Sequence, residues 1–295
     1  MAISAYFIDL PIIFFRHYFS EHPALLCKQG HDVYALIATL RWLDKNRQAL
    51  RSAEYVYCGL DESLGSGFRH SIDPHYKANR ALPTQDIIFQ FALLKELIPA
   101  LGMGLGTGPE FEADDYLASI NQQFNQRYPT KTSAIVTRDK DLRQLLNPQT
   151  LLLDPFSFET LDDVSCAAQM GFPASRMALY LALLGDRSDN ISGIPKIGVK
   201  TAAQLVAHFS CVEQLQAYAE SSDLLGLRGE IQVKKQLRDY HPRIAHNLRL
   251  TRVRYDALPV QDFIAPAMDK EFVKALLKEL DIVRSLTSFI RNLTE

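Results

Sequence analysis

The chain has 295 residues, of which 47% are hydrophobic and 22% charged, and its formal net charge is −2. This composition is that of a globular protein, and the length allows two compact domains. It excludes a uniformly basic chain, although many of the acids are gathered in a few short clusters, so the remaining surface has an excess of lysine and arginine. The early apolar run over residues 3–19 is interrupted by charges and a proline, so we expect neither a signal peptide nor a membrane span.

The cysteines are few and widely separated. Cys27, Cys58, Cys166 and Cys211 form no Cys-x-x-Cys pair, so neither a disulfide framework nor a zinc site is predicted. A reduced cytoplasmic setting is therefore the expectation.

Short apolar runs in the first half of the chain alternate with helix-like segments such as residues 87–101. This alternation predicts an α/β fold with a central parallel or mixed sheet flanked by helices. In such sheets the chemistry collects at the carboxyl ends of the strands. Three of the runs end on or just before an acid, namely Asp9, Asp61 and Asp139. The predicted strands are residues 5–9, 55–60, 134–137 and 151–154.

The strand signals stop after about residue 163, and the segments that follow have helical periodicity. We therefore expect one domain over residues 1–165 and a second, mainly helical domain over residues 166–295, with no long linker between them. The segments predicted to be helical are residues 175–184, 199–208, 231–239 and 270–282.

A set of acids in short clusters is the strongest chemical signal. A spacing of three residues would place Glu112 and Asp115 on one helix face, and would do the same for Asp186 and Asp189. Acids at strand ends and helix starts are often only caps and solvated charges, but this many at consistent positions favour convergence. The set is Asp9, Asp61, Glu112, Asp114, Asp115, Asp139, Asp141, Asp186 and Asp189.

Asp139 and Asp141 would share one side of an extended segment. If the acids of all the clusters meet, their like charges repel, and hard cations are the natural partners. Carboxylate oxygens favour Mg²⁺ or Mn²⁺ over zinc. The sequence therefore predicts a carboxylate site for divalent cations.

A basic strip over residues 68–80 interleaves cations with aromatic rings. If Tyr76 begins a helix, Lys77 and Arg80 share one face, where they could hold a phosphate while Tyr76 stacks on a base. The alternative is a solvated helix start.

A glycine hairpin over residues 193–202 directly follows the last acidic pair and opens a helix. Such an arrangement aims backbone N–H groups at a phosphate without reading sequence. Lys196 and Lys200 add charge. The alternative is that Gly193 and Gly198 are simply turn residues.

These elements, in this order, resemble the 5′-nuclease family: the 5′-to-3′ exonuclease domain of bacterial DNA polymerase I, the phage 5′-exonucleases and the flap endonucleases. The resemblance covers nearly the whole chain, including the tail from Arg252 to Phe289. No polymerase sequence follows, so we expect a free-standing version. The motifs that carry it are Asp9 with Arg16, Phe-Arg-His followed by Tyr-Lys-Ala-Asn-Arg, Glu-Ala-Asp-Asp, Thr-Arg-Asp-Lys-Asp-Leu, and Gly-Asp-Arg-Ser-Asp-Asn running into Gly-Ile-Pro-Lys-Ile-Gly-Val-Lys-Thr-Ala.

The resemblance implies a PIN-like or Rossmann-like nuclease core and a role for each motif. The acids up to Asp141 would hold Mg²⁺ or Mn²⁺, and Asp186 and Asp189 would complete a second, looser site. Residues 70–101 would form a helical arch, and residues 180–210 a helix-three-turn-helix element that grips DNA and can hold K⁺. The implied catalytic residues are Lys77, Arg80, Tyr76 and Arg16, and the implied DNA-binding residues are Arg69, Gly193, Lys196, Gly198, Lys200 and Thr201.

Two positions depart from the family pattern. Leu10-Pro11 follows Asp9 where glycine and a small polar residue are usual, so we expect distortion where the first strand ends. Asp61 lies in Cys-Gly-Leu-Asp-Glu, and Glu62 competes for its role. The last acidic motif is intact, so activity is expected.

The resulting hypothesis is a structure-specific 5′-nuclease that cuts DNA near 5′ ends or flap junctions by two-metal-ion catalysis. One alternative is a non-catalytic protein of the same fold that binds DNA structures, and another is a related ribonuclease. A monomer is expected, and the candidate protein partners are a DNA polymerase or other replication and repair factors.

Overall fold

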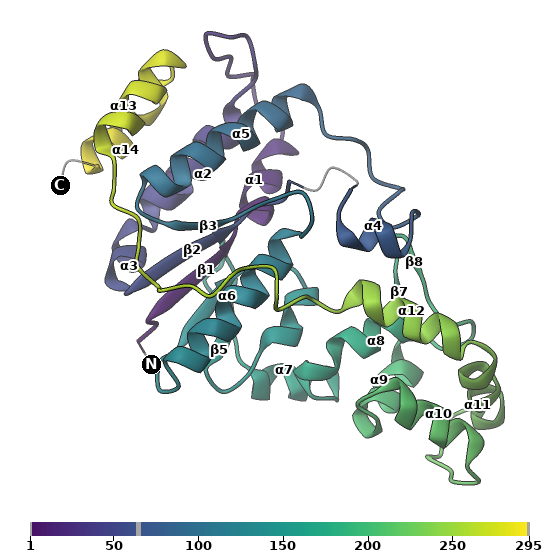
Figure 1. The fold of residues 1–295 in the computed structure, drawn as a ribbon. Helices are drawn as coiled ribbons and strands as arrows, with labels where there is room; N and C mark the ends of the chain where they lie inside the picture. The colour runs from purple at the N-terminus through teal and green to yellow at the C-terminus, as the bar shows by residue number, and fades with distance from the viewer. Residues whose placement is uncertain (1, 63–65, 294–295) are drawn as a thin grey trace.

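The computed structural model describes residues 2–62 and 66–293 and has a twisted six-stranded sheet at its centre (Figure 1). The strand order is β3-β2-β1-β4-β5-β6; the first five strands are parallel and β6 is antiparallel. The strands are β1 (Ala5–Asp9), β2 (Tyr55–Gly59), β3 (Gly104–Gly106), β4 (Ser133–Val136), β5 (Thr150–Leu153) and β6 (Thr160–Leu161).

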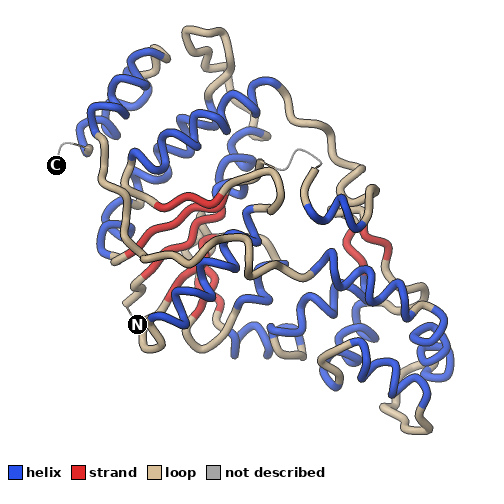
Figure 2. The backbone as a smooth tube through the Cα atoms, viewed as in Figure 1, coloured by secondary structure: helices blue, strands red, loops and turns tan. Residues whose placement is uncertain are grey.

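Helices cover both faces of the sheet (Figure 2), which is why β1, β2 and β4 are buried along their whole length and mostly apolar, with no alternation. On β1, Tyr6 and Ile8 face a core shared with α1, α2 and α5, whereas Ala5 and Phe7 face a core shared with α6 and η1. The helices of this part are α1 (Leu10–Tyr18), α2 (Tyr34–Lys45), α3 (Arg47–Ser52), α4 (Phe68–Ile72), α5 (Gln85–Ala100), α6 (Ala113–Arg127), η1 (Asp141–Leu145) and α7 (Asp163–Met170).

A helical lobe with its own apolar core follows the sheet (Figure 1). A short hairpin of β7 (Gly185–Asp186) and β8 (Ile191–Ser192) connects its first two long helices. The lobe contains η2 (Ala174–Arg176), α8 (Met177–Leu184), α9 (Val199–His208), α10 (Val212–Glu220), α11 (Glu230–Asp239) and α12 (His241–Thr251).

The chain then returns to the sheet. Residues 252–269 cross back as an extended strap to α13 (Lys270–Glu279), η3 (Val283–Leu286) and α14 (Thr287–Asn292) (Figure 1). The buried side chains Val273, Leu277 and Phe289 join the core formed with α2 and α5. The prediction that the helical domain runs from residue 166 to residue 295 is therefore wrong at its end, because residues 270–293 complete the core of the first domain.

The predicted α/β class is confirmed, and the four predicted strands lie within one residue of β1, β2, β4 and β5. The predicted helical arch over residues 70–101 is wrong. Residues 73–84 form turns and extended chain, and α5 packs on the sheet through Leu94, Leu97 and Ile98. Among residues 2–62 and 66–293, no helix is both long enough and apolar enough to span a bilayer.

Candidate active site

Neighbouring parallel strands bring three of the acids to one edge of the sheet. Asp9 is the last residue of β1, Asp61 follows β2, and Asp139 follows β4, and these strands are adjacent in the order β2-β1-β4. A cleft of about 700 Å³ opens there. Its lining includes Asp9, Asp61, Glu112, Asp114, Asp139, Asp141 and Asp189, together with Arg16, Lys77, Arg80, Arg138 and Lys140.

Asp9 is held in place from both sides. One oxygen accepts a bond from the Thr137 hydroxyl at 2.7 Å, and the other accepts from the Ile12 N–H at 3.4 Å, capping α1. Pro11 lies in the first turn of α1, where a missing N–H is tolerated. Strand pairing continues through Asp9 to Gly59. The prediction that Leu10-Pro11 distorts the end of the first strand is therefore wrong.

Asp61, rather than Glu62, is directed to the cleft. The Asp61 carboxylate accepts a bond from the Ala113 N–H at 2.7 Å, at the start of α6. Glu62 pairs instead with Lys95 at 2.6 Å. Asp61 therefore lines the cleft, and Glu62 is not part of its lining.

The three acids at the start of α6 have different roles. Glu112 is the N-cap and Asp115 closes a capping box with it, so the two bond reciprocally at the helix end and do not lie as a free pair on one face. Glu112 and Asp114 line the cleft. Asp115 is fully buried, and its two oxygens accept bonds from Arg69, from the Glu112 N–H and from the Arg254 N–H. The prediction that Asp115 binds metal is wrong for this geometry.

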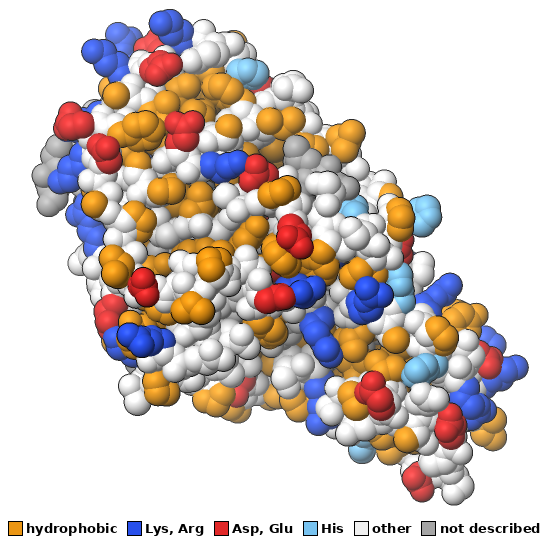
Figure 3. Space-filling model, in the orientation of Figure 1, with side chains coloured by type: hydrophobic (Ala, Val, Ile, Leu, Met, Phe, Trp, Pro, Cys, Tyr) orange, Lys and Arg blue, Asp and Glu red, His pale blue; other side chains and the backbone are white. Residues whose placement is uncertain are grey.

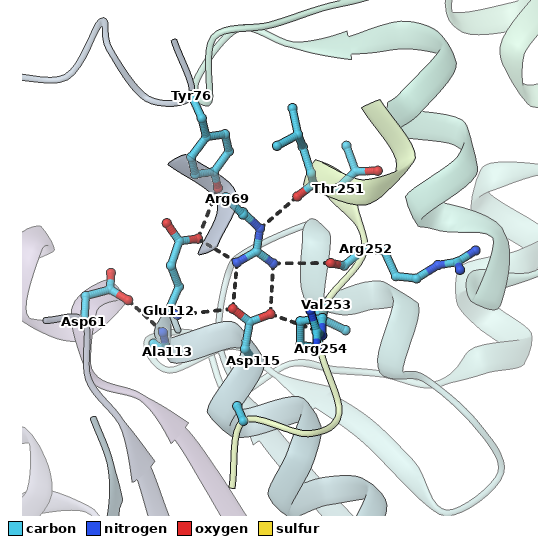
Figure 4. A network of polar contacts seen from close by, with 12 residues as sticks. Asp61, Arg69, Tyr76, Glu112, Ala113, Asp115, Thr251, Arg252, Val253 and Arg254 are labelled. Carbon is cyan, nitrogen blue, oxygen red and sulfur yellow. Dashed lines mark hydrogen bonds and ion pairs between the residues drawn. The ribbon is translucent and has the colours of Figure 1, made fainter. Parts of the chain in front are cut away.

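Arg69 is the counterion of this buried network (Figure 4). Its guanidinium donates to Asp115 at 2.6 and 2.9 Å and to Glu112 at 3.3 Å. Further bonds reach the carbonyls of Leu250 and Arg252, where the helical lobe ends. Since Arg69 is only 4% exposed, the prediction that it contacts DNA is wrong; it joins the two parts of the chain instead.

The segment carrying Tyr76, Lys77 and Arg80 is a series of turns, not the expected helix. Lys77 adopts a φ of 53°, with its N–H bonded to the Asp189 carbonyl at 2.9 Å. Its Nζ reaches Glu112 at 2.7 Å, and Arg80 reaches Asp189 at 2.7 Å. Both cations therefore line the cleft, but turns rather than a helix place them there.

Tyr76 cannot stack on a base in this structure. Its side chain is 3% exposed, and its hydroxyl donates to Glu112 at 3.1 Å and Asp189 at 2.9 Å. The ring packs against Ile191 and Leu250 in a small apolar cluster. The predicted stacking role is wrong because the ring fills the junction between sheet and lobe.

Asp186 and Asp189 lie in the β7–β8 hairpin and its turn, not on a helix face as predicted. Asp186 accepts bonds from Lys140 at 2.5 Å and from the Ser188 N–H and hydroxyl. Burial disfavours its ionisation, but the bond and charge of Lys140 and the bonds from Ser188 together outweigh burial and lower the pKa of Asp186. Asp189 lines the cleft, whereas Asp186 lies behind Lys140.

Asp139 and Asp141 follow β4 in a turn that starts η1, not in an extended segment. Asp139 accepts a bond from the Asp141 N–H at 2.8 Å. Burial raises the pKa of Asp141 to about 8, and the charges of Asp139 and Asp189 add to the effect. Burial likewise raises the pKa of Asp9 to about 7.

Charge is balanced unevenly within the cleft. Burial disfavours the charged form of Glu112, but Lys77 and Arg69 outweigh burial and lower its pKa to about 2. Burial raises the pKa of Asp114 well above its usual range, and the charges of Asp139 and Asp9 raise it further. The buried Asp9 and the half-buried Asp114, Asp139 and Asp141 therefore form a group of carboxylates whose charges are not fully compensated.

This group has the chemistry of a site for a hard divalent cation. Within the described chain, the buried Oδ1 of Asp141 has no hydrogen-bond partner, and the donors are all carboxylate oxygens. In residues 2–62 and 66–293, no three His, Cys, Asp or Glu side chains are already grouped closely enough to hold a metal ion. Lys77 and Arg80 hold Glu112 and Asp189 in ion pairs. The residues fit a cation, with some movement of these side chains.

A stability test follows from the raised pKa values. A folded carboxyl with a raised pKa binds more protons than the unfolded chain, so stability falls as pH rises from about 4, the unfolded pKa, through about 8, the folded pKa of Asp141. We expect the melting temperature in EDTA to fall over this range, and Mg²⁺ or Mn²⁺ to restore it by a few degrees at pH 8.

The variant Asp141→Asn should flatten this pH dependence and weaken the stabilisation by metal. Thermal denaturation of both proteins from pH 5 to pH 8, with and without metal, measures the effect. An unchanged pH profile in Asp141→Asn would contradict the conclusion that the raised pKa of Asp141 contributes to this pH dependence.

The glycine hairpin opens a helix as predicted, since α9 begins at Val199. Ile194 and Ile197 are buried, whereas Lys196 and Lys200 are exposed and Thr201 is half-buried. Gly193 permits close packing, since a Cβ there would lie 2.0 Å from the Leu184 carbonyl oxygen. The hairpin therefore presents Lys196, Gly198 and Lys200 outward on an anchored turn.

The sequence did not single out four residues that shape the cleft: Thr137, Arg138, Asp154 and Phe156. Thr137 positions Asp9, while Arg138 and Arg16 both lie over the Phe156 ring. Asp154 was noted only as the end of a strand. The signal was weak because Phe156 lies 18 positions after Arg138, and their contact depends on the pairing of β4 with β5.

Comparisons with known proteins agree with this architecture. A family profile described as 5′-3′ exonuclease, N-terminal resolvase-like domain, matches residues 4–171. A second, described as 5′-3′ exonuclease, C-terminal SAM fold, matches residues 172–271.

Relatives differ in how much of their length the chain covers. A thermostable DNA polymerase I from Thermus filiformis is 36% identical over 90% of this chain, but the chain covers only 31% of that relative. A 5′-3′ exonuclease from Buchnera aphidicola is 27% identical over 77% of this chain and 78% of its own length.

Solved structures share the fold. T5 5′-exonuclease with bound zinc ions gives a TM-score of 0.63 at 21% identity, covering 94% of this chain and 99% of its own. The catalytic core of Rad2 with a DNA substrate gives 0.59 at 16% identity, covering 98% of this chain and 93% of its own.

Proposed function

Because the chain belongs to the 5′-3′ exonuclease family, we propose that it is a metal-dependent 5′-nuclease that cuts DNA near 5′ ends or flap junctions. One observation carries the proposal: four undercompensated carboxylates, one buried and three half-buried, line a cleft that also contains Lys77 and Arg80. The acids suit a cation, and the lysine and arginine suit a phosphate.

The proposed metal ligands are the cleft carboxylates Asp9, Asp61, Glu112, Asp114, Asp139 and Asp141, with Asp189 and Asp186 as a looser set. Mg²⁺ or Mn²⁺ bound by these oxygens would polarise the phosphate and activate the attacking water. Asp115 is left out because Arg69 occupies it.

Lys77 and Arg80 would hold the scissile phosphate. In the resting protein they pair with Glu112 and Asp189. An entering phosphate offers the same cations a second anion, so it can draw them off the carboxylates and leave those oxygens for the metal. Lys77 is the better placed of the two, since its backbone is fixed to Asp189.

We expect Lys77→Ala to lower the cleavage rate about 10²- to 10³-fold, the effect of removing one donor from a developing oxyanion, while binding of flap DNA changes little. Lys77→Arg should recover part of the rate. Single-turnover cleavage and anisotropy titration with the same substrate measure the two effects. A loss of binding as large as the loss of rate would contradict a role in the transition state.

The helical lobe would grip the duplex through the exposed glycine hairpin, by backbone contacts and lysines that do not read sequence. We propose Lys196, Gly198, Lys200 and Thr201 as this surface, with K⁺ held by hairpin carbonyls. The protein is proposed to act as a monomer, alongside a polymerase that creates flaps; the match to part of DNA polymerase I supports that pairing.

The test of substrate class is cleavage of matched DNA and RNA flaps on the same duplex. DNA-selective cleavage supports the proposal, and RNA-selective cleavage favours the ribonuclease alternative. Tight binding of both without cutting would favour a non-catalytic structure-binding protein.

A further inference from the structure

A second cavity, of about 320 Å³, lies at the opposite end of the sheet from the carboxylate cleft. It opens beside Tyr55 and Val56, the first residues of β2, whereas Asp61 follows the last residue of that strand. The rise of a strand, about 3.3 Å per residue, separates these two ends by roughly 20 Å. An occupant of this pocket would therefore leave the cleft open to DNA.

The walls of the pocket come from segments that are far apart in the sequence. They are α2, α3, the start of β2, residues 101–103, the strap and α14. The match to the C-terminal family profile ends at residue 271, so the wall from α14 lies beyond the matched region. The proposed cleavage uses none of the lining residues. The apolar side chains of the lining include Leu43, Leu50, Val56, Leu101, Met103 and Phe289.

Apolar surface continues from the pocket onto the strap. Ala265 and Met268 line the pocket and are exposed, and the neighbouring Ile264 is 78% exposed. Figure 3 shows hydrophobic side chains gathered over the part of this face that the strap and α13 occupy in Figure 1. A cavity that opens onto further apolar surface suits an anchoring side chain together with the chain that flanks it, rather than an enclosed small molecule.

The two acids in the lining of the pocket already have partners. Asp44 accepts a bond from the Asn292 side chain at 2.7 Å and pairs with Arg47 at 3.5 Å. Glu54 pairs with Lys131. Neither carboxylate is therefore left to neutralise the other cations around the pocket.

Arg51, which also lines the pocket, is exposed and has no acidic partner within the described part of the chain. Its guanidinium donates instead to the Asn292 carbonyl at 3.1 Å. Residues 41–53 and 282–293, which this bond joins, together carry six cations and one acid. The pocket is therefore an apolar cavity with an excess of positive charge at its rim.

We propose that this pocket docks a short segment of a partner protein in which an apolar side chain is flanked by aspartate or glutamate. The apolar side chain would fill the cavity, and its acidic neighbours would meet Arg51 and the cations around it. The partner would bring the nuclease to its substrate without covering the cleft. Docking of this kind goes beyond the proposed cleavage and does not depend on it.

The test is the dissociation constant, measured by fluorescence anisotropy at low salt, of labelled peptides in which leucine, isoleucine, phenylalanine or tryptophan stands between pairs of aspartates. At least one of these peptides should bind the wild-type protein about tenfold more tightly than either control peptide. One control replaces the apolar residue by serine, and the other replaces the aspartates by serine. Binding of all the peptides within twofold of the controls would overturn the inference.

Two neighbouring positions on the strap give a matched pair of variants. Ala265→Glu places a carboxylate at the mouth of the pocket and should weaken binding of the best peptide at least about tenfold. Ile264→Glu adds the same charge at an exposed position outside the lining and should weaken it less than about threefold. Both positions are exposed, so the melting temperatures should stay close to that of the wild type. Equal effects of the two variants would contradict docking in the pocket.

A charge reversal tests the role of the basic rim. Arg51→Glu should weaken binding of the best peptide at least about tenfold and should make the protein prefer a version of that peptide with lysines in place of the aspartates. Arg51→Lys should keep most of the affinity. Lys235→Glu, at an exposed position on α11 in the helical lobe, is the control and should change nothing. An unchanged preference in Arg51→Glu would mean that this cation does not meet the acids.

Other occupants of the pocket give distinct results. A dimer in sedimentation that Ala265→Glu dissociates would make this surface a contact between two copies of the chain. Weaker binding of duplex DNA by Arg51→Glu would assign the rim to DNA. Either result would overturn the inference. Cleavage is a separate readout: a saturating peptide should leave the rate of flap cleavage unchanged, and a protein that binds the peptide but never cuts would refute the nuclease alone.

Discussion

Replacing Asp139 and Asp141 together by asparagine is expected to lower flap cleavage by at least about 10³-fold, since metal ions contribute several kcal/mol to such transition states. Both side chains lie in the cleft beside Asp9 and Asp114, and removing two carboxylates leaves the remaining acids unable to hold the cation. Binding of flap DNA should be unchanged or tighter, because two negative charges that repel phosphate are gone.

The control for this variant is Asp262→Asn with Asp281→Asn, which makes the same change of charge at exposed positions. Asparagine also suits the φ of 57° at Asp281. This control should cut at the wild-type rate. Cleavage by the Asp139/Asp141 variant within about tenfold of wild type would mean that these acids do not hold the catalytic metal.

The second large effect concerns stability. We expect Arg69→Met to destabilise the protein by about 3–5 kcal/mol, the usual result of removing one partner of a buried ion pair. Asp115 has no exposed surface and would be left without its counterion. The bonds from Arg69 to the carbonyls of Leu250 and Arg252 would also be lost, which loosens the junction with the lobe.

Urea denaturation followed by circular dichroism measures this change. The double variant Arg69→Met with Asp115→Asn should recover part of the loss, because it removes the stranded charge as well. Arg69→Lys should fall between wild type and Arg69→Met, since lysine keeps the charge but not the fork. A loss below about 1 kcal/mol in Arg69→Met would contradict the role of the pair.

The strands were predictable because each is a short apolar run that ends near an acid, and this pattern follows from burial on both sheet faces. β3 was not predictable, since Gly104–Gly106 has only three residues and two glycines. The same pattern placed Asp9, Asp61 and Asp139 at one edge before any contact was known. The local sequence was therefore enough to predict which strand ends line the cleft.

The sequence did not predict which charged residues form ion pairs with one another. Arg69 and Lys77 stand in the same basic strip, yet Arg69 is buried against Asp115 while Lys77 faces the cleft. The difference arises because α12 and the strap close over Arg69, through contacts more than 180 residues away in sequence. Spacing along one segment carries no information about such closure.

Tyr76 shows the same limit. A tyrosine between cations indicates base stacking when only the segment is considered. In the folded chain its hydroxyl bridges Glu112 and Asp189, one from the sheet domain and one from the hairpin. Its ring is therefore part of the contact between the sheet domain and the helical lobe.

The measurement that tests the central claim most directly is cleavage of a 5′-flap DNA duplex, labelled at either end, by the wild-type protein in Mg²⁺, Mn²⁺ or EDTA. The carboxylate cleft predicts cuts near the flap junction with either metal and none in EDTA. Tight binding without cuts under all three conditions, or cutting that persists in EDTA, would contradict it.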